Sequence, residues 1–268
     1  VLAMTVVLLA ALFLDARFWL EIAYPLYAVA LVLLIGVELF GATRMGATRW
    51  LDLGPVSLQP SELMKIGIVL ALARYYHQLD ARKTATVLWT VPPFLMIAAP
   101  VALVMHQPDL GTSLLILAAG VIVMFLGGLL WRIIGAGAII AIGGAIFAYT
   151  SILHEYQRER VNVFLGITDD PLGAGYHVLQ SKIAIGSAGL FGRGYMEGTQ
   201  SQLDFLPEKH TDFIFTMIVE EFGLLGGALV LGLFGVLMGL TMQVALRARS
   251  LFGKLAAAGV AATLACYV

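Results

Sequence analysis

Residues 20–40 read LEIAYPLYAVALVLLIGVELF, an apolar run whose two acidic residues, Glu21 and Glu38, lie near its ends. About 20 mostly apolar helical residues are enough to cross the roughly 30 Å hydrocarbon core of a bilayer. Similar runs recur between short polar breaks at residues 1–14, 61–79, 84–105, 112–130, 132–150, 211–242 and 255–268. The sequence therefore predicts an all-α integral membrane protein, a polytopic helical bundle with about eight helices in this chain.

The composition excludes a water-soluble domain. Hydrophobic residues make up 60% of the chain, charged residues only 12%, and the mean hydropathy is +0.92. The net charge is −1 without a block of like charges, so no nucleic acid is expected as a partner. Cys266 is the single cysteine and cannot form an internal disulfide. No internal repeat is evident, which favours one transmembrane domain over residues 1–268, truncated at both ends.

Basic residues in the short loops predict which side of the membrane each loop occupies. Cytoplasmic loops of membrane proteins carry an excess of Lys and Arg. The loops on one side carry only Arg44 and Arg49, whereas those on the other carry Arg17, Arg74, Arg82, Lys83, Arg132, Arg247, Arg249 and Lys254. The second side is therefore predicted to be cytoplasmic. The first side is predicted to be extracytoplasmic and to hold the loop over residues 41–60 and a long loop over residues 151–210.

The long loop is the segment in which chemistry is expected, because it combines many acidic and basic residues with turn signals at Asp170-Pro171 and Gly173-Ala174-Gly175. Its middle part, residues 176–190, mixes apolar residues with Gln180, Ser181 and Lys182 at near-helical spacing. This pattern predicts a helix that lies along the membrane interface.

Two polar groups stand where an outer loop meets an apolar run. Glu62 and Lys65 are three residues apart, so on a helix they share one face and can form an ion pair at the membrane edge. Ionisable side chains at this depth suggest a functional site, although structural pairing is the simpler interpretation. Gln107 and Asp109 form the next outer turn, where Asp109 is expected to cap the following helix or to help line a headgroup site.

The most informative stretch is GTQSQLDFLPEKHTDFIF, residues 198–215, where a polar outer loop runs directly into an apolar helix. Asp212 would stand at the N-terminus of that helix, where the dipole and free N–H groups hold a carboxylate ionised. Beside Lys209 and His210 it could act as a general base, whereas periodicity alone favours an N-cap role. Glu220 is offset from Asp212 by about 80° around the helix, so the two side chains could share a cavity.

Several of these stretches together resemble one family. They are GATRWLDLG at 46–54, QPSE at 59–62, QPDLGT at 107–112, HTDFIF at 210–215 and EEFG at 220–223. In this order they resemble the SEDS family of shape, elongation, division and sporulation proteins. Residues 180–187 and 198–203 resemble its elongation member rather than its division member.

The resemblance implies a ten-helix membrane bundle, with one helix missing here at each end, that polymerises lipid II as a peptidoglycan glycosyltransferase during cell elongation. It places the family's catalytic aspartate on Asp212 and its functionally important Glu–Lys pair on Glu62 and Lys65. The acceptor sugar 4-hydroxyl would attack the donor's anomeric carbon, and undecaprenyl pyrophosphate would leave. Loop cations such as Arg49, Lys182, Arg193 or Lys209 are expected to neutralise this leaving group. A divalent cation, Mg²⁺ or Mn²⁺, could share that role, with ligands unknown.

The resemblance also implies partners and a location. The partners are lipid II, a class B penicillin-binding protein acting as transpeptidase, and other membrane proteins of the rod complex. The location is the bacterial inner (cytoplasmic) membrane, with the active site facing the extracytoplasmic side. Two other functions stay open: a lipid II flippase with Glu62, Lys65 and Glu220 along a polar path, and a non-catalytic scaffold of the wall-synthesis complex.

Overall fold

The computed structural model describes residues 15–44, 47–52, 57–80, 86–107, 109–153, 155, 158, 161–162, 176–195, 197–198 and 213–268. The chain divides into two compact units: unit 1 is Val1–Gly135 with Leu237–Val268, and unit 2 is Ala136–Val236. The single domain predicted from the sequence stays a prediction.

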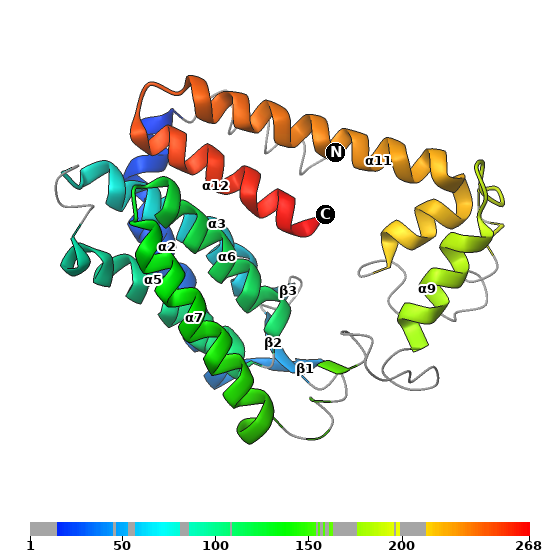
Figure 1. The fold of residues 1–268 in the computed structure, drawn as a ribbon, viewed down its shortest axis with the longest axis horizontal. Helices are drawn as coiled ribbons and strands as arrows, with labels where there is room; N and C mark the ends of the chain where they lie inside the picture. Colours follow the sequence, from blue (N-terminus) through cyan, green and yellow to red (C-terminus); the bar gives the residue numbers. More distant parts are fainter. Residues whose placement is uncertain are drawn as a thin grey trace. The chain divides into compact units, whose positions relative to one another are not determined.

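Unit 1 is a helical bundle built around α3 (Pro60–Gln78). Helices α2 (Ala16–Phe40), α6 (Leu110–Leu126) and α12 (Leu251–Tyr267) pack against α3, and α5 (Val91–His106) packs against α6 (Figure 1). Gly67 permits a close approach of α2, because a Cβ there would lie 3.3 Å from the backbone of Tyr27. The core comes from all five helices and includes Leu34, Ile68, Leu72, Val104, Ile116, Val123 and Leu255.

The predicted apolar segments are helices wherever the structure describes them. Residues 1–14 lie outside the described residues, and the other runs correspond to α2, α3, α5 after the 3₁₀ helix η1 (Val87–Thr90), α6, α7 (Trp131–Phe147), α11 (Ile214–Arg247) and α12. Four described helices are long and apolar enough to cross a membrane: Ala16–Phe40, Leu88–His106, Trp131–Ser151 and Ile214–Arg247. Helix α3 is not one of them. Most of its side chains are buried against neighbouring helices, so it does not need a lipid-facing apolar surface.

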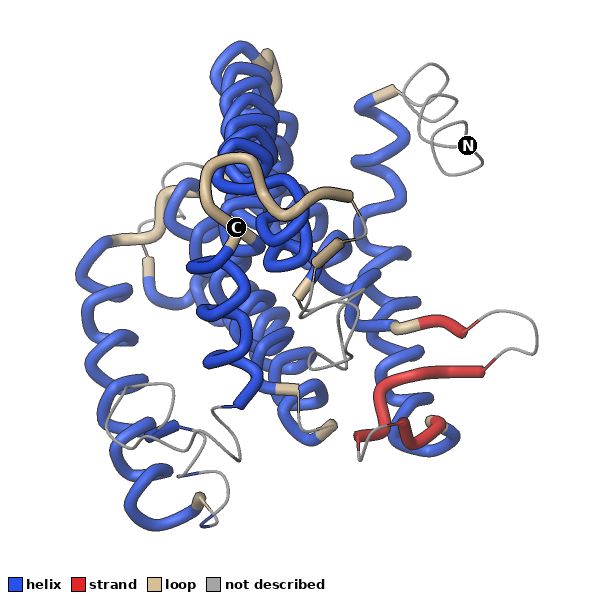
Figure 2. Tube along the Cα trace, turned by 90° about the vertical axis from the view of Figure 1, so that its right-hand side faces the viewer, coloured by secondary structure: helices blue, strands red, loops and turns tan. Residues whose placement is uncertain are grey.

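A small antiparallel sheet replaces the loop predicted over residues 41–60. Strand β1 (Ala42–Arg44) pairs with β2 (Ala47–Asp52), and β2 pairs with β3 (Ser57–Leu58). Figure 2 shows these strands in red. Thr43, Thr48 and Trp50 are residue types that favour strands, which is the local reason for the pairing. Because β2 carries Arg49, the sheet positions one of the predicted cations.

Unit 2 contains most of α7, the π-helix η2 (Ala148–Ile152), α9 (Tyr176–Ser187) and the first part of α11. Helix α9 confirms the helix predicted inside the long loop. Helix α11 is interrupted, since Gly223 has φ 71° and ψ −170°. The apolar run predicted over residues 211–242 therefore does not form one continuous helix, because an apolar run indicates burial but not the backbone conformation of a glycine.

Candidate functional site

The N-terminal end of α3 carries the ion pair that the spacing predicts. Gln59 precedes the helix and Pro60 lies in its first turn. Lys65 Nζ lies 2.8 Å from Glu62 Oε1, with the Lys65 side chain 5% exposed and the Glu62 side chain 55% exposed. The site is therefore a buried ammonium held by a carboxylate that stays accessible.

Tyr267, near the end of α12, completes this group. Its ring centroid lies 4.4 Å from Lys65 Nζ, and its hydroxyl donates to Glu62 Oε2 over 3.5 Å. A cation over an aromatic face is attracted by the ring quadrupole. No sequence signal indicates this contact, since 205 positions separate Tyr267 from Glu62 and only the packing of α12 against α3 joins them. We call Glu62, Lys65 and Tyr267 the ion-pair group.

Arg49, Gln107 and Asp109 form a second polar group, which we call the cap group. Asp109 Oδ1 accepts a hydrogen bond of 3.2 Å from the Thr112 N–H, and Oδ2 accepts one of 2.9 Å from the Thr112 hydroxyl. The capping role predicted for Asp109 is thereby confirmed. Arg49 Nε lies 3.7 Å from Asp109 Oδ2 and donates to the Gln107 carbonyl over 3.5 Å.

Hydrogen bonds hold the cap group to the ends of neighbouring helices. Gln107 is buried, and its Nε2 donates to the Leu34 carbonyl of α2 over 3.2 Å. Beside it, His106 Nδ1 lies 2.9 Å from Glu38 Oε2. Because α2 and α5 end here and α6 begins here, the cap group is fixed by three helices and one strand of unit 1.

In unit 2, Arg193 and Glu220 meet where two stretches of backbone cross. Glu220 is 1% exposed, and its carbonyl accepts a hydrogen bond of 3.0 Å from the Arg193 N–H. Three further backbone bonds join the same stretches: Gly194 N–H to the Glu221 carbonyl at 3.1 Å, Leu224 N–H to the Gly189 carbonyl at 3.0 Å, and Leu225 N–H to the Leu190 carbonyl at 3.2 Å. We call residues 189–194 with 220–225 the crossing.

Glycine is required on both sides of the crossing. Gly192 has φ 79° and Gly223 has φ 71°, values that residues with a Cβ rarely adopt. A Cβ on Gly192 would overlap the Glu221 carbonyl oxygen, and one on Gly223 would overlap the Leu190 carbonyl oxygen. The main chain therefore fixes Arg193 beside the buried Glu220.

The remaining predicted site residues fall into two classes. Lys182 is exposed on α9. Asp212, predicted to be catalytic, lies outside the described residues, as do Lys209 and His210.

Within the described ranges, no three His, Cys, Asp or Glu side chains come together as a metal site. Two described carboxylates of the candidate site face cations, Glu62 facing Lys65 and Asp109 facing Arg49. The divalent cation expected from the resemblance stays a prediction.

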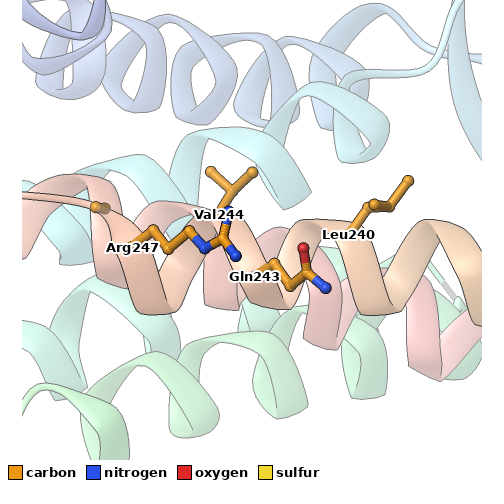
Figure 3. Close-up of a pocket in the computed structure, with 5 residues that line it drawn as sticks. Leu240, Gln243, Val244 and Arg247 are labelled. Carbon is orange, nitrogen blue, oxygen red and sulfur yellow. The ribbon is translucent and has the colours of Figure 1, made fainter.

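A hollow of about 380 Å³ lies along α11 and is lined by Leu240, Gln243, Val244, Arg247 and Ala248 (Figure 3). Its lining residues repeat at helical spacing near the C-terminal end of α11. None of its five lining residues is a predicted site residue, so the hollow is not part of the candidate site.

Long apolar helices with ionisable groups gathered at their ends define a multi-pass helical membrane protein. A model of the FtsW, RodA and SpoVE family, described as "Cell cycle protein", matches residues 1–268. This chain belongs to that family, which confirms the resemblance found in its motifs.

Two relatives show how similar this chain is to known proteins of the family. The chain is 45% identical to the peptidoglycan glycosyltransferase MrdB of Escherichia coli (strain K12), over 91% of this chain and 65% of that protein. It is 34% identical to the probable peptidoglycan glycosyltransferase FtsW of Trichlorobacter lovleyi, over 94% of this chain and 66% of that protein. The chain thus spans slightly less than two thirds of the length of both relatives.

Two solved structures share the fold. The first is described as "Structural coordination of polymerization and crosslinking by a peptidoglycan synthase complex". It matches with a TM-score of 0.77 and 37% identity over 96% of this chain and 71% of that chain. The other, the rod shape determining protein RodA of Thermus thermophilus, matches with a TM-score of 0.62 and 31% identity over 96% of this chain and 68% of that chain. The predicted SEDS-type helical fold is confirmed, as is the similarity to the elongation member.

Proposed function

We propose that this protein is a peptidoglycan glycosyltransferase that polymerises lipid II into glycan strands during cell elongation and releases undecaprenyl pyrophosphate. The observation that carries the proposal is the buried Lys65 ammonium with its accessible Glu62 carboxylate, in a chain 45% identical to E. coli MrdB. A buried charge in a membrane protein is costly and contributes little to stability, so it is expected where it serves a ligand.

The proposed chemical step is a displacement at the anomeric carbon of the donor sugar. The acceptor 4-hydroxyl forms the new C–O bond, the bond from the anomeric carbon to the pyrophosphate oxygen breaks, and the hydroxyl proton passes to the Asp212 carboxylate. Charge that develops on the departing pyrophosphate is stabilised by Arg49, Lys182, Arg193 and Lys209. The activated leaving group supplies the driving force, so the step needs no nucleotide.

In the proposed mechanism, a divalent cation binds only together with the substrate. A Mg²⁺ or Mn²⁺ ion would come bound to the pyrophosphate, because Glu62 and Asp109 already face Lys65 and Arg49. The remaining predicted residues have supporting roles: Gln107 and Asp109 orient Arg49, and His210 binds the substrate. Because Glu220 is buried, its proposed role is to support the site rather than to contact the substrate.

The interior of α3 supports the polymerase over a flippase. The buried side chains that follow Lys65 along α3 are Gly67, Ile68, Val69, Leu70, Ala71, Leu72, Ala73 and Tyr76. A flippase moves a charged headgroup through the bilayer and needs polar groups along the way. Apart from Tyr76, this buried face of α3 offers only apolar side chains beyond Lys65.

We further propose that the site faces the extracytoplasmic side of the bacterial inner membrane, and that a class B penicillin-binding protein and other rod-complex proteins bind this chain. The structural neighbour from a peptidoglycan synthase complex supports a partner of this kind. Helices α11 and α12 and the long loop over residues 151–210 are the proposed contact surfaces.

The test is polymerisation of lipid II by purified protein in detergent, with and without the transpeptidase partner. Only a polymerase yields long glycan there, because no sealed compartment exists for a flippase to act across. Asp212→Asn should abolish the product, while Asp80→Asn, the same change at an exposed position just beyond the opposite end of α3, should leave it intact. An active Asp212→Asn variant removes the base assignment, and an inactive natural protein rejects the proposed function.

A further inference from the structure

The ion-pair group places an aromatic ring on a buried cation. Lys65 is 4% exposed, so its ammonium has lost most of its hydration and depends on protein groups for compensation. Glu62 Oε1 accepts one hydrogen bond of 2.8 Å from the Lys65 ammonium. An ammonium has three N–H donors, so one carboxylate oxygen does not satisfy it.

The face of Tyr267 supplies a second source of compensation. The ring centroid lies 4.4 Å from Lys65 Nζ, well inside the roughly 6 Å over which a cation and a ring attract. The hydroxyl of the same ring reaches the other carboxylate oxygen, Glu62 Oε2, at 3.5 Å. One side chain from α12 therefore contacts both members of a pair that belongs to α3.

Exposure shows which member of the group faces a ligand. The Lys65 side chain is covered, whereas the Glu62 side chain is 55% exposed. The group thus presents a carboxylate whose two oxygens are oriented by Lys65 and Tyr267. A carboxylate in this state accepts hydrogen bonds, and the groups that donate them to it are hydroxyls and amide N–H groups.

We propose that Tyr267 is a positioning residue: it fixes the Lys65–Glu62 pair so that Glu62 accepts a hydrogen bond from a hydroxyl or acetamido N–H of a substrate sugar. This inference rests on the proposed function and adds to it a residue that no motif contains. The ring holds the cation, and the hydroxyl makes the weaker contribution because its hydrogen bond is long.

The contact is tested first by chemistry at Lys65, independently of activity. Purified protein in detergent is acylated with an amine-reactive ester, and the labelling rate at Lys65 is followed by peptide mass spectrometry. Tyr267→Leu removes the π-face and part of the bulk of the ring and should raise that rate about threefold to tenfold, while Tyr267→Phe should match the natural protein. Cys266→Ala, at the exposed neighbouring position, is the matched control and should also leave the rate unchanged.

A graded series separates the cation–π contact from simple packing. Phenylalanine with one, two or three ring fluorines at position 267 keeps the shape of the ring and progressively weakens its negative face. Lys65 labelling should rise steadily along this series. A flat series, or a Tyr267→Leu variant that remains folded and labels like the natural protein, overturns the proposal.

The kinetics of lipid II polymerisation then test whether Tyr267 affects the use of the substrate. Tyr267→Leu should raise KM for lipid II about tenfold with a smaller change in kcat. Tyr267→Phe keeps the ring and should avoid most of this increase in KM. Equal kinetics for Tyr267→Leu and the natural protein would overturn the positioning role. If no protein polymerises lipid II while labelling responds as expected, the proposed function fails and the contact of Tyr267 with the pair stands.

Discussion

The backbone N–H of Arg193 donates a hydrogen bond of 3.0 Å to the backbone carbonyl of Glu220, which ties the long loop to the interrupted part of α11. Main-chain atoms make this bond, so it does not depend on either side chain. Gly192 and Gly223 matter more, because a Cβ on either one would overlap the opposite backbone.

Replacing either glycine by alanine should destabilise unit 2. Gly192→Ala and Gly223→Ala each introduce a Cβ that overlaps a backbone atom and force a residue with a Cβ into positive φ, at an expected loss of about 1–3 kcal/mol or more. Thermal unfolding in detergent measures the loss. Gly232→Ala is the control, since a Cβ there meets no heavy atom within 4 Å. Equal melting temperatures for all three variants would contradict the crossing.

Removing Glu62 should lower the stability of the protein more than removing Lys65. Glu62→Ala leaves the buried Lys65 ammonium without its carboxylate and should lower stability by about 3 kcal/mol. Lys65→Met leaves only an accessible carboxylate and should change stability by less than about 1 kcal/mol. Combining the two changes should recover most of the loss seen in Glu62→Ala. Thermal melts of the three variants give the answer, and a double variant as unstable as Glu62→Ala would refute this account.

Asp109 combines a helix cap with an ion pair, and two substitutions separate these roles. Asp109→Ala removes the cap of α6 and should lower stability by about 1 kcal/mol. Asp109→Asn retains a capping oxygen but loses the charge that faces Arg49, so its melting temperature should be close to that of the natural protein. If Arg49 binds pyrophosphate, Asp109→Asn should still raise KM for lipid II. A normal KM in this variant would confine Asp109 to its capping role.

Lys182 offers a test of the proposed leaving-group cations. Its side chain is exposed on α9, so Lys182→Ala should leave the melting temperature unchanged while lowering kcat/KM about tenfold. Lys182→Arg should retain activity, because the charge is kept. Lys254→Ala is the matched control, an exposed lysine in the first turn of α12 at the predicted cytoplasmic end. Equal activities of the two alanine variants would remove Lys182 from the site.

The helices were the most predictable part of the fold. An apolar run in a membrane protein must satisfy its backbone internally, so every run that the structure describes is a helix. Local side-chain contacts could also be predicted. The spacing of Glu62 and Lys65 predicts that they pair, and the position of Asp109 predicts that it caps the following helix. In each case the partners lie within one helical turn of each other.

Contacts between distant segments could not be predicted. Tyr267 reaches Glu62 only through the packing of two helices, and no local pattern encodes that packing. The crossing depends on paired backbones rather than on side chains. Four glycines of the crossing, Gly189, Gly192, Gly194 and Gly223, have positive φ. In the sequence, glycines at these positions indicate turns but not which segments they join.

The crossing also restricts how the chain can change during evolution. An extra residue within 189–194 would change the spacing between the backbone bonds on its two sides, so the four bonds to residues 220–225 could not all form in their present register. Insertions and deletions among homologues should therefore fall outside both stretches. An alignment gap inside either one would identify a protein in which the arginine and the buried glutamate are no longer neighbours.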